Sequence, residues 1–233
     1  MKQLICVLGM FMAFAVNAQS NNELTKHYEA YYAQMKKQGD VQGVINALTH
    51  LNVLKPDQGR TDTLAYLYAN GRNYLQALNT IGIEKNASDS DLAVEVKAIS
   101  LKAMNQLPRA IEQYEELNKR APNPYLAYEL ADLKIQTNDV TGATTHITYG
   151  LANAKDDMKR AFYESQQPYE TSLKAAFTYL KGLAELRKDQ KNIDGALTFI
   201  NQALNMDPNF NMARISRDAL ENRKKQAAAA AKN

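Results

Sequence analysis

Residues 107–114 read LPRAIEQY, and the same pattern recurs at a period of 33, twice before this stretch and once after it. The four stretches begin at Val41, Tyr74, Leu107 and Val140. A small residue follows three positions later, and an apolar or aromatic residue four positions after that: Val44/Leu48, Ala77/Ile81, Ala110/Tyr114 and Ala143/Ile147. The pattern returns once more as Ile193, Ala196 and Ile200. A fixed period in the thirties, with helical spacing inside each unit, indicates a solenoid of stacked helical hairpins.

Each repeat divides into two helices around a short polar turn. The turns are expected at Gly39-Asp40, Gly71-Arg72-Asn73, Asn105-Gln106 and Asn138-Asp139, each between two apolar stretches of helical period. The small residue has a physical reason, because two antiparallel helices that cross closely leave room for little more than a methyl group. The first repeat has Val44 at this point, so we expect a slightly wider crossing there.

These residues make the chain resemble tetratricopeptide repeat (TPR) proteins of the secreted or periplasmic bacterial type. The family pattern ends in alanine, an aromatic or aliphatic residue four later and proline twelve after the alanine. It is met by Ala110/Tyr114/Pro122 and Ala196/Ile200/Pro208, and by Val44/Leu48/Pro56 with one change. The resemblance covers roughly residues 24–220. It implies an all-α, right-handed α-solenoid of about five helical hairpins with a C-terminal capping helix.

The chain departs from the family pattern in three ways: it has no tryptophan, its spacing is one residue short, and the second and fourth repeats lack the final proline. A period of 33 also suits ankyrin repeats. Their Thr-Pro-Leu-His signature is absent, however, and no hairpin strand pattern is apparent.

The period of 33 is interrupted after the fourth repeat, because Ala143 and Ala196 are separated by one period plus about twenty residues. Apolar residues step by three or four from Val140 to Phe162, and Pro168 is the first strong breaker. We expect one long helix over about 140–166; the alternative is two helices split near Asp156-Asp157. The fifth hairpin would follow, and a final helix from about Asn209 would close the solenoid.

The first eighteen residues have the form of a cleavable signal peptide. Lys2 supplies a positive charge, Leu4 to Val16 are apolar, and small residues precede a cleavage site before Gln19. We therefore expect three parts: signal peptide 1–18, a helical repeat domain 19–220 and a basic, alanine-rich tail 221–233. The single cysteine, Cys6, stands too early to be a lipoprotein cysteine, so a periplasmic or secreted protein without an integral membrane segment is expected.

Composition argues against several classes of function. The whole chain has 28 Lys and Arg against 25 Asp and Glu, a net charge of +3, which gives no reason to expect nucleic acid as a partner. The basic excess is local, at residues 214–225, where it forms either a solvated helix end or a contact with an acidic surface. The three histidines are isolated, and no phosphate loop or nucleophile motif is present, so no catalysis, cofactor or metal is expected.

The inner face of the solenoid is the candidate binding site. In this architecture the first helix of each hairpin lines the inner surface, and projecting the register places eight residues there as partner-binding candidates: Tyr66, Asn70, Glu95, Lys102, Tyr125, Tyr128, Glu129 and Asp132. Ile99 and Gln136 fall on the same faces. Tyrosine, which offers a large contact area and a polar tip, suits recognition surfaces. Four other tyrosines, Tyr28, Tyr68, Tyr74 and Tyr114, are expected to pack between hairpins.

These features predict an exported, non-catalytic scaffold whose concave groove binds a protein or peptide of unknown identity. Two alternatives stay open: an envelope-assembly accessory, and a small-molecule or glycan-binding component. Some TPR relatives grip a C-terminal carboxylate with basic and amide side chains on successive inner helices. The matching positions here hold Glu29, Ala33 and Thr63, so that clamp is not expected.

Overall fold

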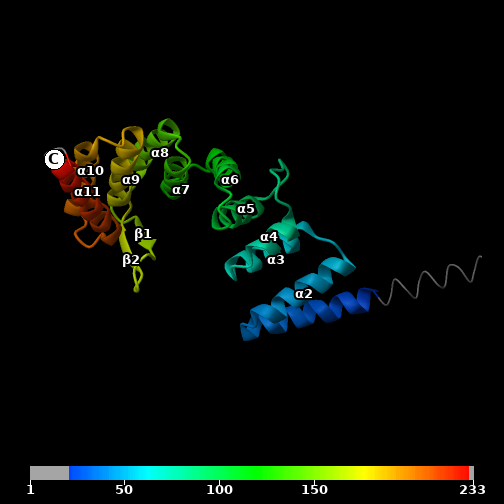
Figure 1. Cartoon of the computed structure of the whole chain (residues 1–233). Helices are drawn as coiled ribbons and strands as arrows, with labels where there is room; N and C mark the ends of the chain where they lie inside the picture. Colours follow the sequence, from blue (N-terminus) through cyan, green and yellow to red (C-terminus); the bar gives the residue numbers. More distant parts are fainter. Residues whose placement is uncertain (1–20, 231–233) are drawn as a thin grey trace, which may run out of the picture. The chain divides into compact units, whose positions relative to one another are not determined.

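A computed structural model describes residues 21–230 (Figure 1). The expected signal peptide 1–18 and its cleavage before Gln19 lie outside the described residues. The described residues form two compact units, which meet between Gln106 and Leu107 in the sequence. The boundary falls after Gln106, in the turn of the third expected hairpin.

The described part of the first unit is all helical. A helix over residues 21–38 precedes α2 (Val41–Leu54), α3 (Gln58–Asn70), α4 (Tyr74–Ile81) and α5 (Asp91–Ala103). Each of α2, α4 and α5 packs on α3 or on its neighbour in sequence. Small cores form between them, one around Ile45, Leu48 and Leu64 and another around Ala65, Ala77 and Val96.

The second unit continues the same order and adds a small sheet. Its helices are α6 (Leu107–Arg120), α7 (Pro124–Gln136), α8 (Val140–Asn153), α9 (Leu173–Lys188), α10 (Ile193–Met206) and α11 (Asn211–Ala230). Between α8 and α9, strands β1 (Lys159–Phe162) and β2 (Tyr169–Ser172) pair antiparallel, with Phe162 opposite Tyr169. Figure 1 shows this hairpin at the end of α9, and one continuous core runs from α7 to α11.

The expected all-α helical repeat and its register are confirmed in these elements. The small residues Ala77, Ala110, Ala143 and Ala196 are all fully buried. In the first repeat, by contrast, Val44 is half-buried, and the close contact falls at Gly43, where a Cβ atom would lie 2.5 Å from Met35 Sδ. Glycine, not valine, therefore lets these two helices approach.

The period of 33 extends to the backbone of the turns. Gly39, Arg72, Asn105 and Asn138 keep this period, and all four have φ between 57° and 70°. Glycine and asparagine adopt this left-handed backbone conformation most readily. It ends the first helix of each hairpin before the second helix begins. Two of the helices that follow, α2 and α8, start at a side chain that accepts a backbone N–H three positions on: Asp40 and Asp139 respectively.

The expected long helix over 140–166 is wrong. Helix α8 ends at Asn153, residues 156–157 form a turn, and the chain then enters β1. The chain breaks where the alternative placed the split, but strands follow instead of a second helix, and this also corrects the expectation of no strand hairpin. Met158, Arg160 and Phe162 stand at every second position, which is the spacing of a strand. Because Met158 and Phe162 are also four residues apart, the same pair fits a helix, and the sequence pattern does not distinguish the two.

The C-terminal helix is longer than the expected tail boundary suggests. Leu220 is its last buried residue, but α11 continues to Ala230, with residues 221–230 exposed. Alanine has the highest intrinsic helix propensity, which favours this extension without packing. Residue 220 thus marks the end of burial and not the end of the helix.

Candidate functional site

One hollow lies between the first helices of two successive repeats in the first unit. This N-terminal hollow has a volume of about 220 Å³. It is lined by Tyr66, Ala69 and Asn70 from α3, Arg72 and Tyr74 after it, and Glu95, Val96 and Ile99 from α5. The side chains of Tyr66 and Ile99 remain 44% and 39% exposed at its surface.

The structure therefore brings together three of the four candidates that the register placed in the first unit: Tyr66, Asn70 and Glu95. Residues four apart on one helix share a face, which puts Tyr66 beside Asn70 on α3 and Glu95 beside Ile99 on α5. Lys102, the fourth candidate here, lies on α5 but does not line the hollow. Arg72 and Tyr74 line it as well, although the first-helix register did not select them.

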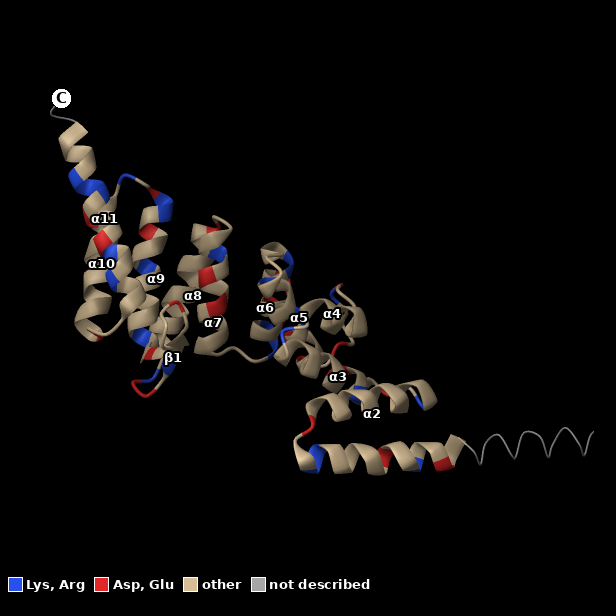
Figure 2. Ribbon diagram, turned by 60° about the horizontal axis from the view of Figure 1, so that its bottom comes forward, with Lys and Arg blue, Asp and Glu red and all other residues tan. Residues whose placement is uncertain are grey.

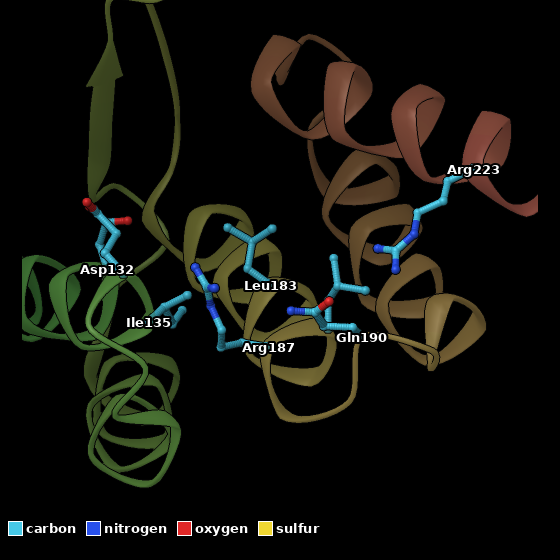
Figure 3. A pocket seen from close by; sticks show the side chains of 8 residues that line it. Asp132, Ile135, Leu183, Arg187, Gln190 and Arg223 are labelled. Atoms are coloured by element: carbon cyan, nitrogen blue, oxygen red, sulfur yellow. The ribbon is translucent and has the colours of Figure 1, made fainter.

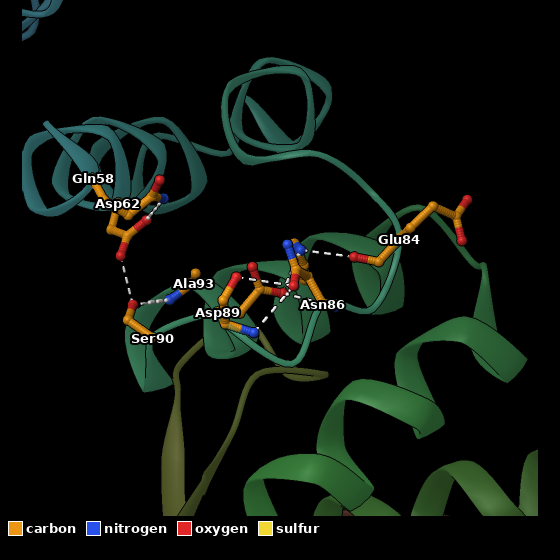
Figure 4. A network of polar contacts seen from close by, with 9 residues as sticks. Gln58, Asp62, Glu84, Asn86, Asp89, Ser90 and Ala93 are labelled. Carbon is orange, nitrogen blue, oxygen red and sulfur yellow. Dashed lines mark hydrogen bonds and ion pairs between the residues drawn. The ribbon is translucent and has the colours of Figure 1, made fainter. Parts of the chain in front are cut away.

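A buried polar network joins α3 to the start of α5 (Figure 4). Asp62 on α3, only 3% exposed, accepts hydrogen bonds from Gln58 Nε2 at 2.7 Å and from Ser90 Oγ at 2.5 Å. Ser90 Oγ in turn accepts from the backbone N–H of Ala93 at 3.1 Å, which caps α5. The loop that precedes α5 is thereby held to α3.

Lys97 secures the other end of that loop. Its side chain is 1% exposed, and its ammonium group lies 2.5 Å from Asp89 Oδ2 and 2.7 Å from the carbonyl oxygen of Glu84. A buried cation needs such partners, because leaving it without a counter-charge costs several kcal/mol. This pair cannot be identified from the sequence, because nothing in the helical period distinguishes a buried lysine from a solvated one.

A second hollow lies on the first helices of the second unit (Figure 3). This C-terminal hollow has a volume of about 380 Å³ and is lined only by α7, α9 and α11 and the residues next to them. Its residues are Asp132, Ile135 and Gln136 from α7, Leu183, Leu186, Arg187 and Gln190 near or on α9, and Arg223 from α11. Asp132 is the candidate from the register that lines it, and Tyr125 lies elsewhere on α7, 44% exposed.

Tyr128 does not belong to an open surface, which corrects the expectation for this residue. Its side chain is 3% exposed, and its ring meets Phe177 edge-on at 5.5 Å and Phe162 of β1 at 6.5 Å. Burial raises the pKa of the Tyr128 hydroxyl far above its ordinary value. The reason is the β-hairpin, which covers the start of α7 where a plain repeat would leave a groove.

Arg160 of β1 holds the β-hairpin against α7 through contacts with two neighbouring residues, Tyr128 and Glu129. Its guanidinium lies 4.0 Å from the centroid of the Tyr128 ring and donates to Glu129 Oε1 at 2.7 Å. Glu129, another candidate, is therefore held in an internal ion pair, with only 17% of its side chain exposed. Of the four candidates on α7, Tyr125 and Asp132 retain access to solvent or to a hollow.

The remaining expectations about chemistry concern metals and membranes. Within residues 21–230, no group of three or more His, Cys, Asp and Glu side chains is placed to hold a metal ion. His50 stacks on Tyr28 at 4.3 Å, and His27 meets the same ring edge-on. None of the helices in this described range combines the length and apolar character that crossing a membrane requires.

Comparison with known proteins shows the fold of the chain but not its family. No family model and no curated protein matches the sequence. Among solved structures, a tetratricopeptide repeat protein from Parabacteroides merdae is similar at a TM-score of 0.63 and 15% identity, covering 91% of this chain and 76% of its own. The MamA protein is similar at a TM-score of 0.58 and 15% identity, covering 80% of this chain and 93% of its own. At such identities the likeness shows the fold alone.

Proposed function

We propose that this chain, which has the tetratricopeptide repeat fold, is an interaction scaffold that binds a protein or peptide partner across its first helices. One observation carries the proposal: Tyr66, Asn70 and Glu95, selected from the repeat register as inner-face residues, line a single hollow together with Ile99. A segment laid across α3 and α5 would meet an aromatic ring, an amide, a carboxylate and an aliphatic side chain side by side. This mixture suits recognition of a peptide.

The surroundings of the hollow are rigid, which favours binding. The hydrogen bond of Ser90 to Asp62 ties the start of α5 to α3, and Lys97 fixes the preceding loop to α5, so the lining side chains are placed before a partner arrives. A preformed surface loses less conformational entropy on binding than a flexible one. Tyrosine adds to this advantage, since it offers a large contact area with few rotatable bonds.

Binding is proposed to be the whole activity, without chemistry on the partner. The lining groups of both hollows are aliphatic, phenolic, amide, carboxylate and guanidinium groups, and contact and hydrogen bonding are the roles that they suit. A glycan or small-molecule ligand is the alternative that the sequence leaves open. This alternative is favoured if a sugar displaces the protein partner and the same variants lose affinity for that sugar.

Export is a separate part of the proposal and rests on residues 1–18 alone. The positive residue, the apolar stretch and the small residues before Gln19 have the form of a secretory signal. An accessory role in envelope assembly would be a narrower version of the same function. N-terminal sequencing of the protein recovered from its native compartment tests this, with Gln19 expected as the first residue and Met1 as the contradicting result.

The proposed function is tested by comparing two apolar truncations in the same unit. Proteins that copurify from the native extract are identified, and their affinities for the wild-type chain, Tyr66→Ala and Leu75→Ala are measured. Tyr66 lines the N-terminal hollow, whereas Leu75 is 59% exposed on α4 and lines none of the hollows described above. Tyr66→Ala should weaken binding by about 1 kcal/mol or more, as loss of an aromatic anchor does. An effect of Leu75→Ala alone would contradict the proposal.

A further inference from the structure

Two arginines in the C-terminal hollow have no acidic partner among residues 21–230. Arg187 at the end of α9 and Arg223 on α11 both line the hollow, and neither forms an ion pair there with a described carboxylate. Two other basic residues of α11 are neutralised: Lys224 pairs with Asp194, and Arg217 pairs with Asp218. What distinguishes Arg187 and Arg223 is that both lack a described acidic partner and both line the same hollow.

The single carboxylate of the hollow interacts with residues other than the two arginines. Asp132 accepts a hydrogen bond from Gln136 Nε2 at 3.0 Å, and its charge acts on Arg160 and Tyr128. Figure 3 shows its carboxylate turned away from Arg187 and Arg223. Because Asp132 does not neutralise the two guanidinium groups, the hollow presents a net positive charge to an approaching ligand.

Apolar side chains share the hollow with the two arginines (Figure 3). Leu183 and Leu186 of α9 and Ile135 of α7 line it, and Gln190 adds an amide that can donate a hydrogen bond. Basic residues also outnumber acidic ones along both α9 and α11, as the blue bands of Figure 2 show on α11. The surface combines two positive positions with an aliphatic floor.

We infer that the C-terminal hollow binds an acidic, leucine-like peptide segment of a partner protein. Carboxylates of the segment would lie against Arg187 and Arg223, whose guanidinium groups can donate two parallel hydrogen bonds to a carboxylate in a planar arrangement. An aliphatic side chain between them would pack on Leu183 and Leu186. This inference rests on the proposed function and adds to it the chemical class of the partner and a site distinct from the N-terminal hollow.

The test uses the purified protein on an array of short random-sequence peptides that span a range of net charge. Bound peptides should be enriched in Asp or Glu together with Leu, Ile or Val. The double variant Arg187→Gln/Arg223→Gln should lose the acidic enrichment, and the affinity of the best acidic peptide should fall by about tenfold, with each single variant costing about threefold. Added salt should weaken wild-type binding and affect the double variant less.

The control is Arg214→Gln, which removes the same charge from α11 at an exposed residue that does not line the hollow. It should leave acidic enrichment unchanged, whereas an equal loss in this variant would overturn the inference in favour of a diffuse charge effect. If the bound peptides show no enrichment in Asp or Glu, but their binding is still lost in Leu186→Gln, the inference is overturned and the proposed function is kept. Absence of any peptide binding, or a preference for DNA or heparin, would contradict both.

Discussion

Gly150→Ala tests the packing of the second unit at one atom. A Cβ built on Gly150 of α8 would lie 2.0 Å from Cζ of Phe177 and 2.3 Å from both its Cε atoms. The ring would have to withdraw by about 1.5 Å to reach ordinary van der Waals contact. Phe177 is fully buried, and Tyr128 stands edge-on against it at 5.5 Å, so no space is open for that movement.

Two opposing effects set the magnitude. Alanine inside a helix is more favourable than glycine by about 1 kcal/mol, and overpacking a filled core costs about 1–3 kcal/mol. We expect a net loss of up to about 2 kcal/mol, seen as a lower urea midpoint for the second unit by circular dichroism. Without the contact to Phe177 the same substitution would stabilise the protein, so the sign of the change is informative.

Phe177→Leu supplies the matched background for a double-mutant cycle. Removing the ring relieves the clash, and Gly150→Ala should then be neutral or stabilising by up to about 1 kcal/mol relative to Phe177→Leu alone. The reasoning is refuted if Gly150→Ala stabilises the wild-type chain. It is also refuted if the loss is the same in both backgrounds.

Three further predictions concern stability. Tyr128→Ala should destabilise the second unit by about 3–5 kcal/mol, as truncation of a buried aromatic side chain does. A variant that folds and melts at the same temperature as the wild-type chain would contradict the burial of Tyr128. Asp89→Asn should cost about 3–5 kcal/mol because Lys97 would be left charged and buried, with Lys97→Met/Asp89→Asn recovering part of the loss in the same denaturation experiment. Asp139→Ala should cost about 1 kcal/mol through the lost cap of α8. Because its hydrogen bonds to Gly142 and Lys134 lower the pKa of Asp139, this contribution is present above about pH 4 and is lost as the pH falls below it, so midpoints of wild type and variant should converge in acid.

The hairpin register can be read from the sequence because it is a local property. The alanines at 77, 110, 143 and 196 are buried as their spacing requires, and the left-handed turns at 39, 72, 105 and 138 repeat with them. The same register identifies Tyr66, Asn70 and Glu95 correctly as neighbours. Periodicity sets which face of a helix is buried, and that is sufficient for these residues.

The insertion between α8 and α9 cannot be predicted in this way, because its contacts are distant in sequence. Phe162 packs on Phe210 at 5.0 Å, Thr171 donates to Asp207, and the hydroxyl of Tyr169 accepts from Met212 N at 3.0 Å. All three partners lie beyond the end of α10, so a whole helical hairpin separates them from the strands in sequence.

The same kind of distant contact explains the two residues of the site that the register places least well. Tyr128 of α7 is covered by β1, which enters the chain only after the whole of α8. Arg223 is visible in the sequence only as part of a basic stretch, and the direction in which it faces depends on how α11 packs. Helical periodicity carries no information about either contact, because each depends on an element outside the repeat concerned.

Site-specific photo-cross-linking tests the central claim, that a partner lies across the first helices. A photoreactive phenylalanine analogue is placed singly at Tyr66 or Tyr125, each 44% exposed on a first helix, and at Val53 or Leu75, 78% and 59% exposed on second helices. We expect covalent capture of the copurifying protein from the Tyr66 and Tyr125 positions, and little capture from Val53 or Leu75. Capture from Val53 or Leu75, with none from the first helices, would contradict it.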